Sequence, residues 1–163
     1  MIRDKFNELI NIIFEKTKDF YKDNLISFIV FGSCGRDTPT NESDIDILII
    51  LNEINFNRMK RMKIFYENVE KKIENEIKNY EKYNINTYIS PIIRSKEEVK
   101  YGSPLYIEMI LGVKIIYDKD NFFKNYLKRL ENKLNKLKSS KKNGYWIFLY
   151  QLKNILKKMQ SRL

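Results

Sequence analysis

Apolar and polar positions divide the chain into short apolar runs and longer amphipathic segments. Apolar runs at 25–31, 44–51, 85–93 and 113–117 predict four buried strands. Helical spacing predicts amphipathic helices over 2–22 and 56–80, and shorter helices after Ser95 (a capping box with Glu98) and after Ser103-Pro104. This order predicts an α/β or α+β domain in which a small mixed sheet of about four strands is flanked by helices. The short connection between the first two runs favours antiparallel pairing of those strands.

The C-terminal region shows a different pattern. Apolar residues step by three and four from Phe123 to Leu137 and again from Tyr145 to Met159, with a polar break at 139–144. The pattern predicts a helical hairpin over 121–163, which follows a main domain over 1–120 in the sequence. The apolar stripes are expected to pack on the rest of the domain. A dimer interface or a helical partner protein is the alternative.

Composition excludes several kinds of chemistry. The 163 residues contain no His and one Cys, so Ser-His-Asp triads, Cys-His dyads, Cys/His zinc sites and an internal disulfide are all excluded. An enzyme of this composition must use carboxylates, hydroxyls, Lys/Arg or a hard metal ion. No apolar run of about 18 residues and no signal-peptide pattern is present. A cytoplasmic protein without a membrane partner is therefore expected.

The positive charge is concentrated at one end of the chain. The formal net charge is +10, and residues 124–163 carry 12 Lys/Arg against the single acid Glu131. A basic helical surface is consistent with RNA or an acidic partner bound through residues 124–163. The alternative is a solvated, Lys-rich surface.

Two carboxylates stand at the start of the second apolar run. Asp44 and Asp46 alternate with Ile45 and Ile47, so both carboxylates are expected on the same face of a strand. Ionising both at the end of an apolar strand is costly unless a cation lies between them. Oxygen ligands favour Mg²⁺ or Mn²⁺.

A Gly-Ser turn ends the preceding apolar run. Gly32 allows backbone to approach a ligand closely, and a helix that starts at Ser33 would turn its amide groups toward an anion. Arg36 offers a bidentate phosphate contact. Gly32, Ser33 and Arg36 therefore predict a phosphate site opposite a metal-binding pair, Asp44 and Asp46.

Together these segments resemble the signature of the DNA polymerase β-like nucleotidyltransferase superfamily. In that signature, hydrophobic-Gly-[Gly/Ser] is followed after 9–13 residues by Asp-hydrophobic-[Asp/Glu]-hydrophobic. Here Phe31-Gly32-Ser33 is followed, after residues 34–43, by Asp44-Ile45-Asp46-Ile47. The Gly-Ser-Cys-Gly-Arg segment is most similar to the minimal nucleotidyltransferases, which include the MntA-type protein adenylyltransferase antitoxins.

The resemblance implies the nucleotidyltransferase fold and a Mg²⁺-dependent or Mn²⁺-dependent reaction catalysed at Asp44 and Asp46. A hydroxyl of a protein or small molecule would attack the α-phosphorus of ATP, or of another nucleoside triphosphate, and pyrophosphate would leave. Gly32, Ser33 and Arg36 would hold the phosphates.

One part of the superfamily pattern is missing. A third carboxylate is expected on the next strand, but residues 85–90 contain no acid, and Asn86 or Tyr88 would take its place. Nearby acids that could substitute are Glu108 on the following helix and Asp118 at the end of the fourth strand, and Glu108 is the candidate third metal ligand. Two alternatives therefore stay open: a catalytically degenerate nucleotide-binding or antitoxin-type module, and an RNA-binding or RNA-modifying protein.

Overall fold

The computed structural model of the chain describes residues 1–136, 141–142 and 145–146. Its helices are α1 (Ile2–Tyr21), α2 (Gly32–Gly35), α3 (Arg58–Asn68), α4 (Glu74–Lys78), α5 (Lys96–Lys100), α6 (Pro104–Met109) and α7 (Phe122–Lys136). Its strands are β1 (Leu25–Val30), β2 (Ile45–Leu51), β3 (Ile89–Ser95), β4 (Lys114–Asp118), β5 (Lys141–Lys142) and β6 (Tyr145–Trp146). Short 3-10 turns are η1 (Lys22–Asn24), η2 (Glu70–Ile73), η3 (Asn79–Tyr83) and η4 (Lys119–Asn121).

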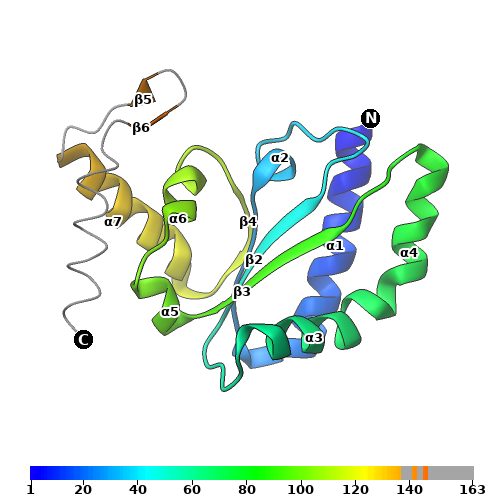
Figure 1. Ribbon diagram of the computed structural model, residues 1–163, viewed down its shortest axis with the longest axis horizontal. Helices are drawn as coiled ribbons and strands as arrows, with labels where there is room; N and C mark the ends of the chain where they lie inside the picture. Colours follow the sequence, from blue (N-terminus) through cyan, green and yellow to red (C-terminus); the bar gives the residue numbers. More distant parts are fainter. Residues whose placement is uncertain (137–140, 143–144, 147–163) are drawn as a thin grey trace.

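The centre of the fold is a four-stranded mixed sheet in the order β3-β2-β1-β4 (Figure 1). β1 is antiparallel to both β2 and β4, whereas β2 and β3 are parallel. The predicted mixed sheet and the antiparallel pairing of its first two strands are thus confirmed. The parallel pair needs a long crossover, which the helices between β2 and β3 supply.

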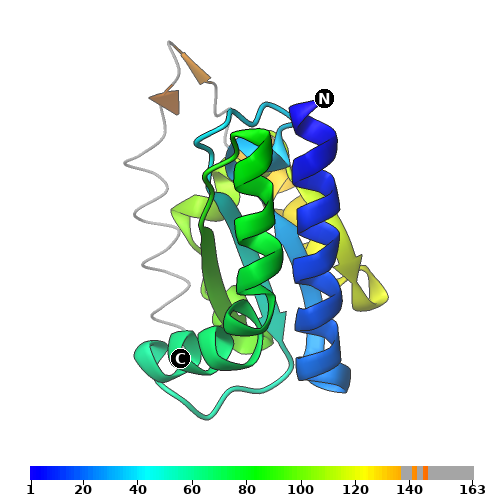
Figure 2. The same ribbon diagram turned by 90° about the vertical axis from the view of Figure 1, so that its right-hand side faces the viewer.

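Helices cover both faces of this sheet, as Figures 1 and 2 show together. The first core cluster joins α1, with Phe6, Leu9 and Ile13, to the residues of β2 that alternate from Ile45 to Leu51. The second cluster joins Leu48 and Ile50 of β2 to α5, α6 and α7. Because side chains alternate along a strand, Asp46 shares the second face with Leu48 and Ile50. The predicted fold class is confirmed.

The single long helix predicted over 56–80 is wrong. The segment is divided into α3, η2, α4 and η3, and the helix ends where Val69 has φ −118° and ψ −68°. Phe65, Val69 and Ile73 are all fully buried against the sheet. These three side chains are thus buried as their spacing predicts, and the segment contains no Pro or Gly that would have predicted the breaks.

The strand predicted over 85–93 begins four residues later and ends two residues later in the structure, since β3 spans Ile89–Ser95. Its partner β2 begins only at Ile45, because residues 40–43 form a turn in which the Ser43 amide donates to the Thr40 carbonyl (3.1 Å). Residues 85–88 therefore have no partner strand to join. Pro91 is tolerated because β3 is an edge strand.

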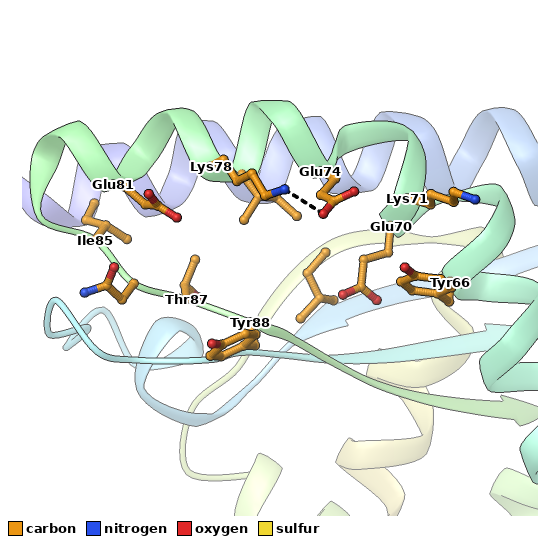
Figure 3. Close-up of a pocket in the computed structure, with 12 residues that line it drawn as sticks. Tyr66, Glu70, Lys71, Glu74, Lys78, Glu81, Ile85, Thr87 and Tyr88 are labelled. Atoms are coloured by element: carbon orange, nitrogen blue, oxygen red, sulfur yellow. Dashed lines mark hydrogen bonds and ion pairs between the residues drawn. The ribbon is translucent and has the colours of Figure 1, made fainter.

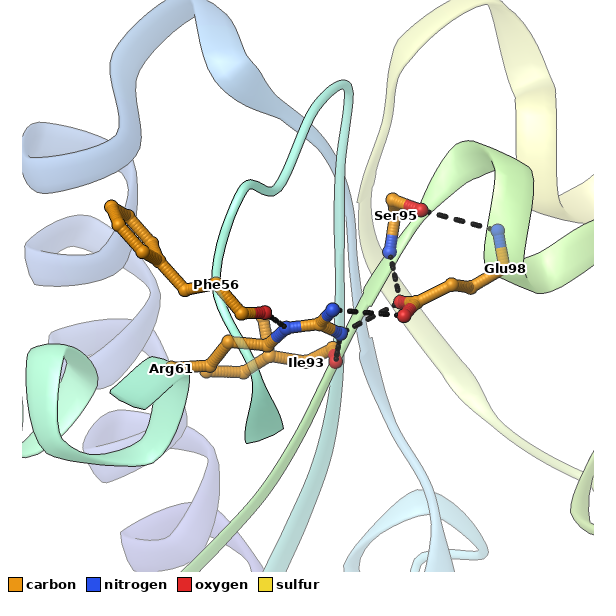
Figure 4. Close-up of polar contacts among 5 residues, drawn as sticks. All are labelled: Phe56, Arg61, Ile93, Ser95 and Glu98. Atoms are coloured by element: carbon orange, nitrogen blue, oxygen red, sulfur yellow. Dashed lines mark hydrogen bonds and ion pairs between the residues drawn. The ribbon is translucent and has the colours of Figure 1, made fainter. Parts of the chain in front are cut away.

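A partly buried ion pair holds the far end of β3 in place (Figure 4). Arg61 of α3 donates to both carboxylate oxygens of Glu98, at 2.7 and 2.8 Å, and to the carbonyls of Phe56 (2.7 Å) and Ile93 (3.2 Å). Glu98 and Ser95 form the predicted capping box at the start of α5. The pair thus links α3, β3 and α5, and it helps to fix the position of β3 in the sheet.

The C-terminal prediction is confirmed only in its first part. α7 begins one residue after the predicted start and packs on the sheet through Phe123. The helix predicted from Tyr145 is wrong at its start, because Tyr145–Trp146 pair with Lys141–Lys142 as antiparallel strands.

The rest of the second predicted helix, residues 147–159, lies outside the described residues. The division at residues 120 and 121 stays a prediction. None of the helices in the described part of the chain combines the length and apolar character needed to cross a bilayer.

Candidate functional site

The turn after β1 is tied to the start of β2. The Phe31 amide donates to the Asp46 carbonyl (3.0 Å), and α2 begins at the next residue. Within the turn, the Gly35 amide donates to the Phe31 carbonyl and the Arg36 amide to the Gly32 carbonyl. Amide groups in the first turn of a helix have no intrahelical acceptor. The predicted Gly-Ser turn therefore presents its amides directly beside the strand that carries Asp46.

Gly32 is required by the space around it. Its φ is +66°, and a Cβ at this position would lie 2.3 Å from Asp46 Oδ2. Gly35 is equally constrained, because a Cβ there would lie 2.6 Å from the Val30 carbonyl oxygen. The close approach of backbone that the Gly-Ser pattern predicts is thus directed at the Asp46 carboxylate itself.

Asp44 and Asp46 differ in environment. Asp44 is exposed and precedes β2, whereas Asp46 is half-buried within it. Burial raises the pKa of the Asp46 carboxyl, and the negative charge of Asp44 raises it further. The Ser90 hydroxyl and the Arg36 guanidinium oppose this shift, since both favour the ionised form. Two interacting carboxylates that are costly to ionise together are a suitable donor set for a divalent cation.

Arg36 and Ser33 also lie at this site. Arg36 is exposed, and its Cγ lies against Gly112, where a Cβ would approach it to 3.3 Å. Ser33 is partly buried, and its carbonyl accepts from the Thr38 amide (2.9 Å). The structure thus brings the predicted residues Gly32, Ser33, Arg36, Asp44 and Asp46 to one end of the sheet.

The predicted third acid is not part of this group. Within residues 1–136, 141–142 and 145–146, no three His, Cys, Asp or Glu side chains are grouped so that they could hold a metal ion. Glu108, on α6, is therefore not brought into a set with Asp44 and Asp46. Asp118 has a structural role, because it accepts from the Ser27 hydroxyl (2.6 Å) and from the Phe123 and Lys124 amides at the start of α7 (3.0 Å each).

Ser90 is the residue that sequence reasoning missed. The parallel register places Ser90, and neither Asn86 nor Tyr88, opposite Asp46. The cause is the later start of β3. The only signal in the sequence was Asn84, a residue type that tolerates the left-handed conformation (φ 59°) with which η3 ends.

Cys34 is a packing residue of the turn. It is buried, its Sγ lies 3.5 Å from the Asp44 carbonyl oxygen, and burial raises its pKa to about 11. Since the thiolate is the reactive form, this thiol is unsuited to act as a nucleophile at neutral pH.

Comparison with known families gives a direct result: residues 10–142 match the family model of the nucleotidyltransferase domain. The chain belongs to the nucleotidyltransferase domain family. A curated relative, "Putative protein adenylyltransferase MJ1305" from Methanocaldococcus jannaschii, is 36% identical over 134 residues, which cover 81% of this chain and 85% of the relative. The range matched by the family model, residues 10–142, includes the Gly-Ser turn, the Asp pair and α7.

Solved structures with lower similarity were also found. One is a toxin-antitoxin crystal structure with AMP-PNP, which is 15% identical in sequence (TM-score 0.47). The alignment covers 78% of this chain and 88% of the chain in that structure. Another is the crystal structure of the toxin-antitoxin MntA-HepT, which is 12% identical in sequence (TM-score 0.48). The alignment covers 80% of this chain and 88% of the chain in that structure.

Proposed function

We propose that this nucleotidyltransferase-family protein transfers AMP from ATP to a hydroxyl of a protein or small molecule and releases pyrophosphate. The observation that carries the proposal is the close approach of Gly32 to the Asp46 carboxylate, which supports a turn that would bind phosphate beside a pair of carboxylates. The name of the 36% identical relative supports an adenylyl group as the moiety transferred.

Asp44 and Asp46 are the residues that would hold Mg²⁺ or Mn²⁺. Their oxygen donors suit a hard cation, which often uses one or two carboxylates together with phosphate oxygens. When bound, such an ion neutralises phosphate charge and makes the α-phosphorus more electrophilic. Asp46 is the more buried of the two and the one whose pKa is raised, so a cation at this site would relieve the cost of its ionisation.

The phosphates would be held by the turn and by Arg36. The amides of α2 and the Ser33 hydroxyl donate to phosphate oxygens, and the exposed guanidinium of Arg36 adds a charged donor. In this arrangement the acceptor hydroxyl attacks in line with the bond to the departing pyrophosphate. Positioning and charge neutralisation carry such a reaction, which agrees with the lack of any His in the chain.

A labelling experiment tests the proposal. The full chain is incubated with α-labelled ATP, MgCl₂ and a panel of Tyr-, Ser- and Thr-containing peptides and small polyols. We expect label transfer that falls about 100-fold or more in Asp44→Asn and Asp46→Asn. Asp4→Asn, which removes an exposed carboxylate on α1, is the matched control and should keep full activity. If Asp44→Asn and Asp46→Asn transfer as much label as the wild type, the roles proposed for Asp44 and Asp46 are overturned.

The second candidate is a nucleotide-binding module without turnover. This candidate is favoured by the observation that Ser90, rather than an acid, lies opposite Asp46. It predicts that the protein binds a non-hydrolysable ATP analogue in calorimetry, that binding weakens in Arg36→Ala, and that no label is transferred to any acceptor of the panel.

A further inference from the structure

Lys114 joins segments that lie far apart in the sequence. Its Nζ lies 2.6 Å from Asp37 Oδ1 and donates a hydrogen bond to Asn7 Oδ1 (2.7 Å). Lys114 belongs to β4, Asp37 follows the Gly-Ser turn, and Asn7 belongs to α1. The hydrogen bond from Lys114 holds the pKa of the Asp37 carboxyl below its usual range, and the charges of Lys114 and Arg3 act in the same direction. One ammonium group therefore ties the end of the turn to α1 and β4.

Asp37 ends the Gly-Ser turn in a left-handed conformation. Its φ is +62°, which is uncommon for residues other than glycine. The Asp37 amide donates to the Cys34 carbonyl (3.4 Å), and the Thr38 amide donates to the Ser33 carbonyl (2.9 Å). These two bonds form the Schellman motif, in which a left-handed residue after the C-cap lets the chain close back on its helix. The backbone conformation of Asp37 is thus what closes the turn onto Ser33.

Lys114 supports this turn from the face of the sheet opposite to Asp46. In the register of β1 and β4, Lys114 pairs with Val30, whose side chain belongs to the core cluster that α1 covers. Directly paired residues share a face of the sheet, and the contact with Asn7 agrees with this placement. Asp46 lies on the other face, with the second core cluster. Lys114 is therefore placed to hold the turn from behind, and not to contact a phosphate beside Asp46.

We propose that Lys114 is a positioning residue of the nucleotide site, a role that rests on the function proposed above. By holding the Asp37 carboxylate, Lys114 keeps this residue left-handed and the turn closed. The closed turn fixes Ser33 and Arg36, two of the residues proposed to hold phosphate. Asn7 in turn holds the ammonium group from α1. Without Lys114, residue 37 leaves the left-handed region more readily and the turn opens locally.

Amide hydrogen exchange, followed by NMR on the full chain, tests whether Lys114 holds the turn. Lys114→Met keeps an unbranched side chain and removes its charge. Because Asp37 is 49% exposed, its carboxylate stays hydrated in this variant, and loss of the pair has little effect on global stability. We expect the Thr38 amide to exchange about tenfold or more faster than in the wild type, while the amides of β1 and β2 exchange at the same rate. This measurement needs no nucleotide.

Calorimetric titration with a non-hydrolysable ATP analogue and MgCl₂ tests the consequence for the site. Lys114→Met should bind the analogue about tenfold more weakly than the wild type, because Ser33 and Arg36 are no longer held in one arrangement before binding. The matched control is Lys78→Met, which removes an exposed ion pair with Glu74 on α4 (2.8 Å, Figure 3). It should bind the analogue like the wild type.

A second change separates positioning from charge. Glycine adopts a left-handed backbone without the steric cost of a Cβ, so with Asp37→Gly the turn no longer needs the ion pair. In the double variant Lys114→Met/Asp37→Gly, we expect Thr38 protection and analogue binding to return to within about threefold of the wild type. If Lys114 acted through its charge on bound phosphate, or only through overall stability, Asp37→Gly would not restore binding.

The proposal is overturned if the Thr38 amide exchanges at the wild-type rate in Lys114→Met, or if this variant binds the analogue as tightly as the wild type does. It is also overturned if Asp37→Gly leaves analogue binding weak in the double variant. A wild type that binds no analogue would contradict the function proposed above, and the exchange rate of the Thr38 amide would still decide whether Lys114 holds the turn.

Discussion

Ser90 lies opposite Asp46 in the parallel register of β2 and β3, on the strand where the superfamily pattern leads one to expect a third carboxylate. The two side chains are close enough for the Ser90 hydroxyl to favour the ionised form of Asp46. An acid in place of Ser90 would therefore turn the acidic pair of Asp44 and Asp46 into a group of three acids.

Replacing Ser90 by Asp would supply that third carboxylate. We expect Ser90→Asp to bind Mn²⁺ about tenfold more tightly than the wild type, because a further charged oxygen ligand faces Asp46. Calorimetric titration with MnCl₂ measures the change, and Ser90→Asn is the uncharged control. Unchanged or weaker Mn²⁺ binding in Ser90→Asp would show that position 90 does not face the metal-binding pair.

A side chain at position 32 should disrupt the site. Gly32→Ala places a Cβ against Asp46 Oδ2 and imposes φ +66° on Ala, so we expect a loss of about 1–3 kcal/mol in the free energy of unfolding, together with loss of nucleotide binding. Urea denaturation and titration with an ATP analogue measure the two effects.

The matched control for Gly32 is Gly102→Ala. Gly102 also has a positive φ (80°) but lies in the turn between α5 and α6. The Gly102→Ala variant should lose stability through backbone strain but should still bind nucleotide. An equal loss of binding in both variants would show that general destabilisation, and not the contact with Asp46, is the cause.

Asp46 should reduce stability at neutral pH. Its pKa is raised in the folded protein, so between the unfolded-state and folded-state pKa values the folded protein binds more protons, and the stability falls as the pH rises through this window. We therefore expect Asp46→Asn, measured without metal, to be more stable than the wild type at pH 7. The difference should shrink as the pH falls below the folded-state pKa. Urea denaturation at several pH values tests this, and a less stable Asp46→Asn at pH 7 would contradict it.

Breaking the pair of Arg61 and Glu98 should loosen β3. Arg61→Met leaves the partly buried Glu98 carboxylate without its main partner, and we expect a cost of about 2 kcal/mol. Burial alone would raise the pKa of Glu98, but the hydrogen bonds from Arg61 and from the Ser95 amide outweigh it and hold the pKa below its usual range. The stabilisation is therefore present at neutral pH and is lost as the pH falls through the folded-state pKa.

The control for Arg61 is Lys63→Met, which removes an exposed pair with Glu67 (3.8 Å) on the same helix. It should change stability by less than about 0.5 kcal/mol. Both variants are compared by urea denaturation at pH 7 and at pH 4. A cost for Arg61→Met that does not decrease at pH 4 would contradict the assignment to the ion pair.

Local patterns were sufficient to predict the parts of the molecule that depend on local chemistry. The apolar run before Gly32, the alternation that starts at Asp44 and the capping box of Ser95 and Glu98 each correspond to an element found in the structure. These features hold because glycine conformation, strand alternation and helix capping are properties of a few adjacent residues. The Gly-Ser turn and the Asp pair of the site were therefore predictable from the sequence.

Only tertiary structure decided which residues meet across the sheet. The sequence by itself determined a chain with an acidic pair, a glycine turn and no His, and hence the kind of chemistry available to it. The breaks in the helix at 58–83 and the start of β3 at Ile89 depend on what each segment packs against. Because a parallel register is set by hydrogen bonds to a distant strand, the position of Ser90 beside Asp46 followed only from the fold.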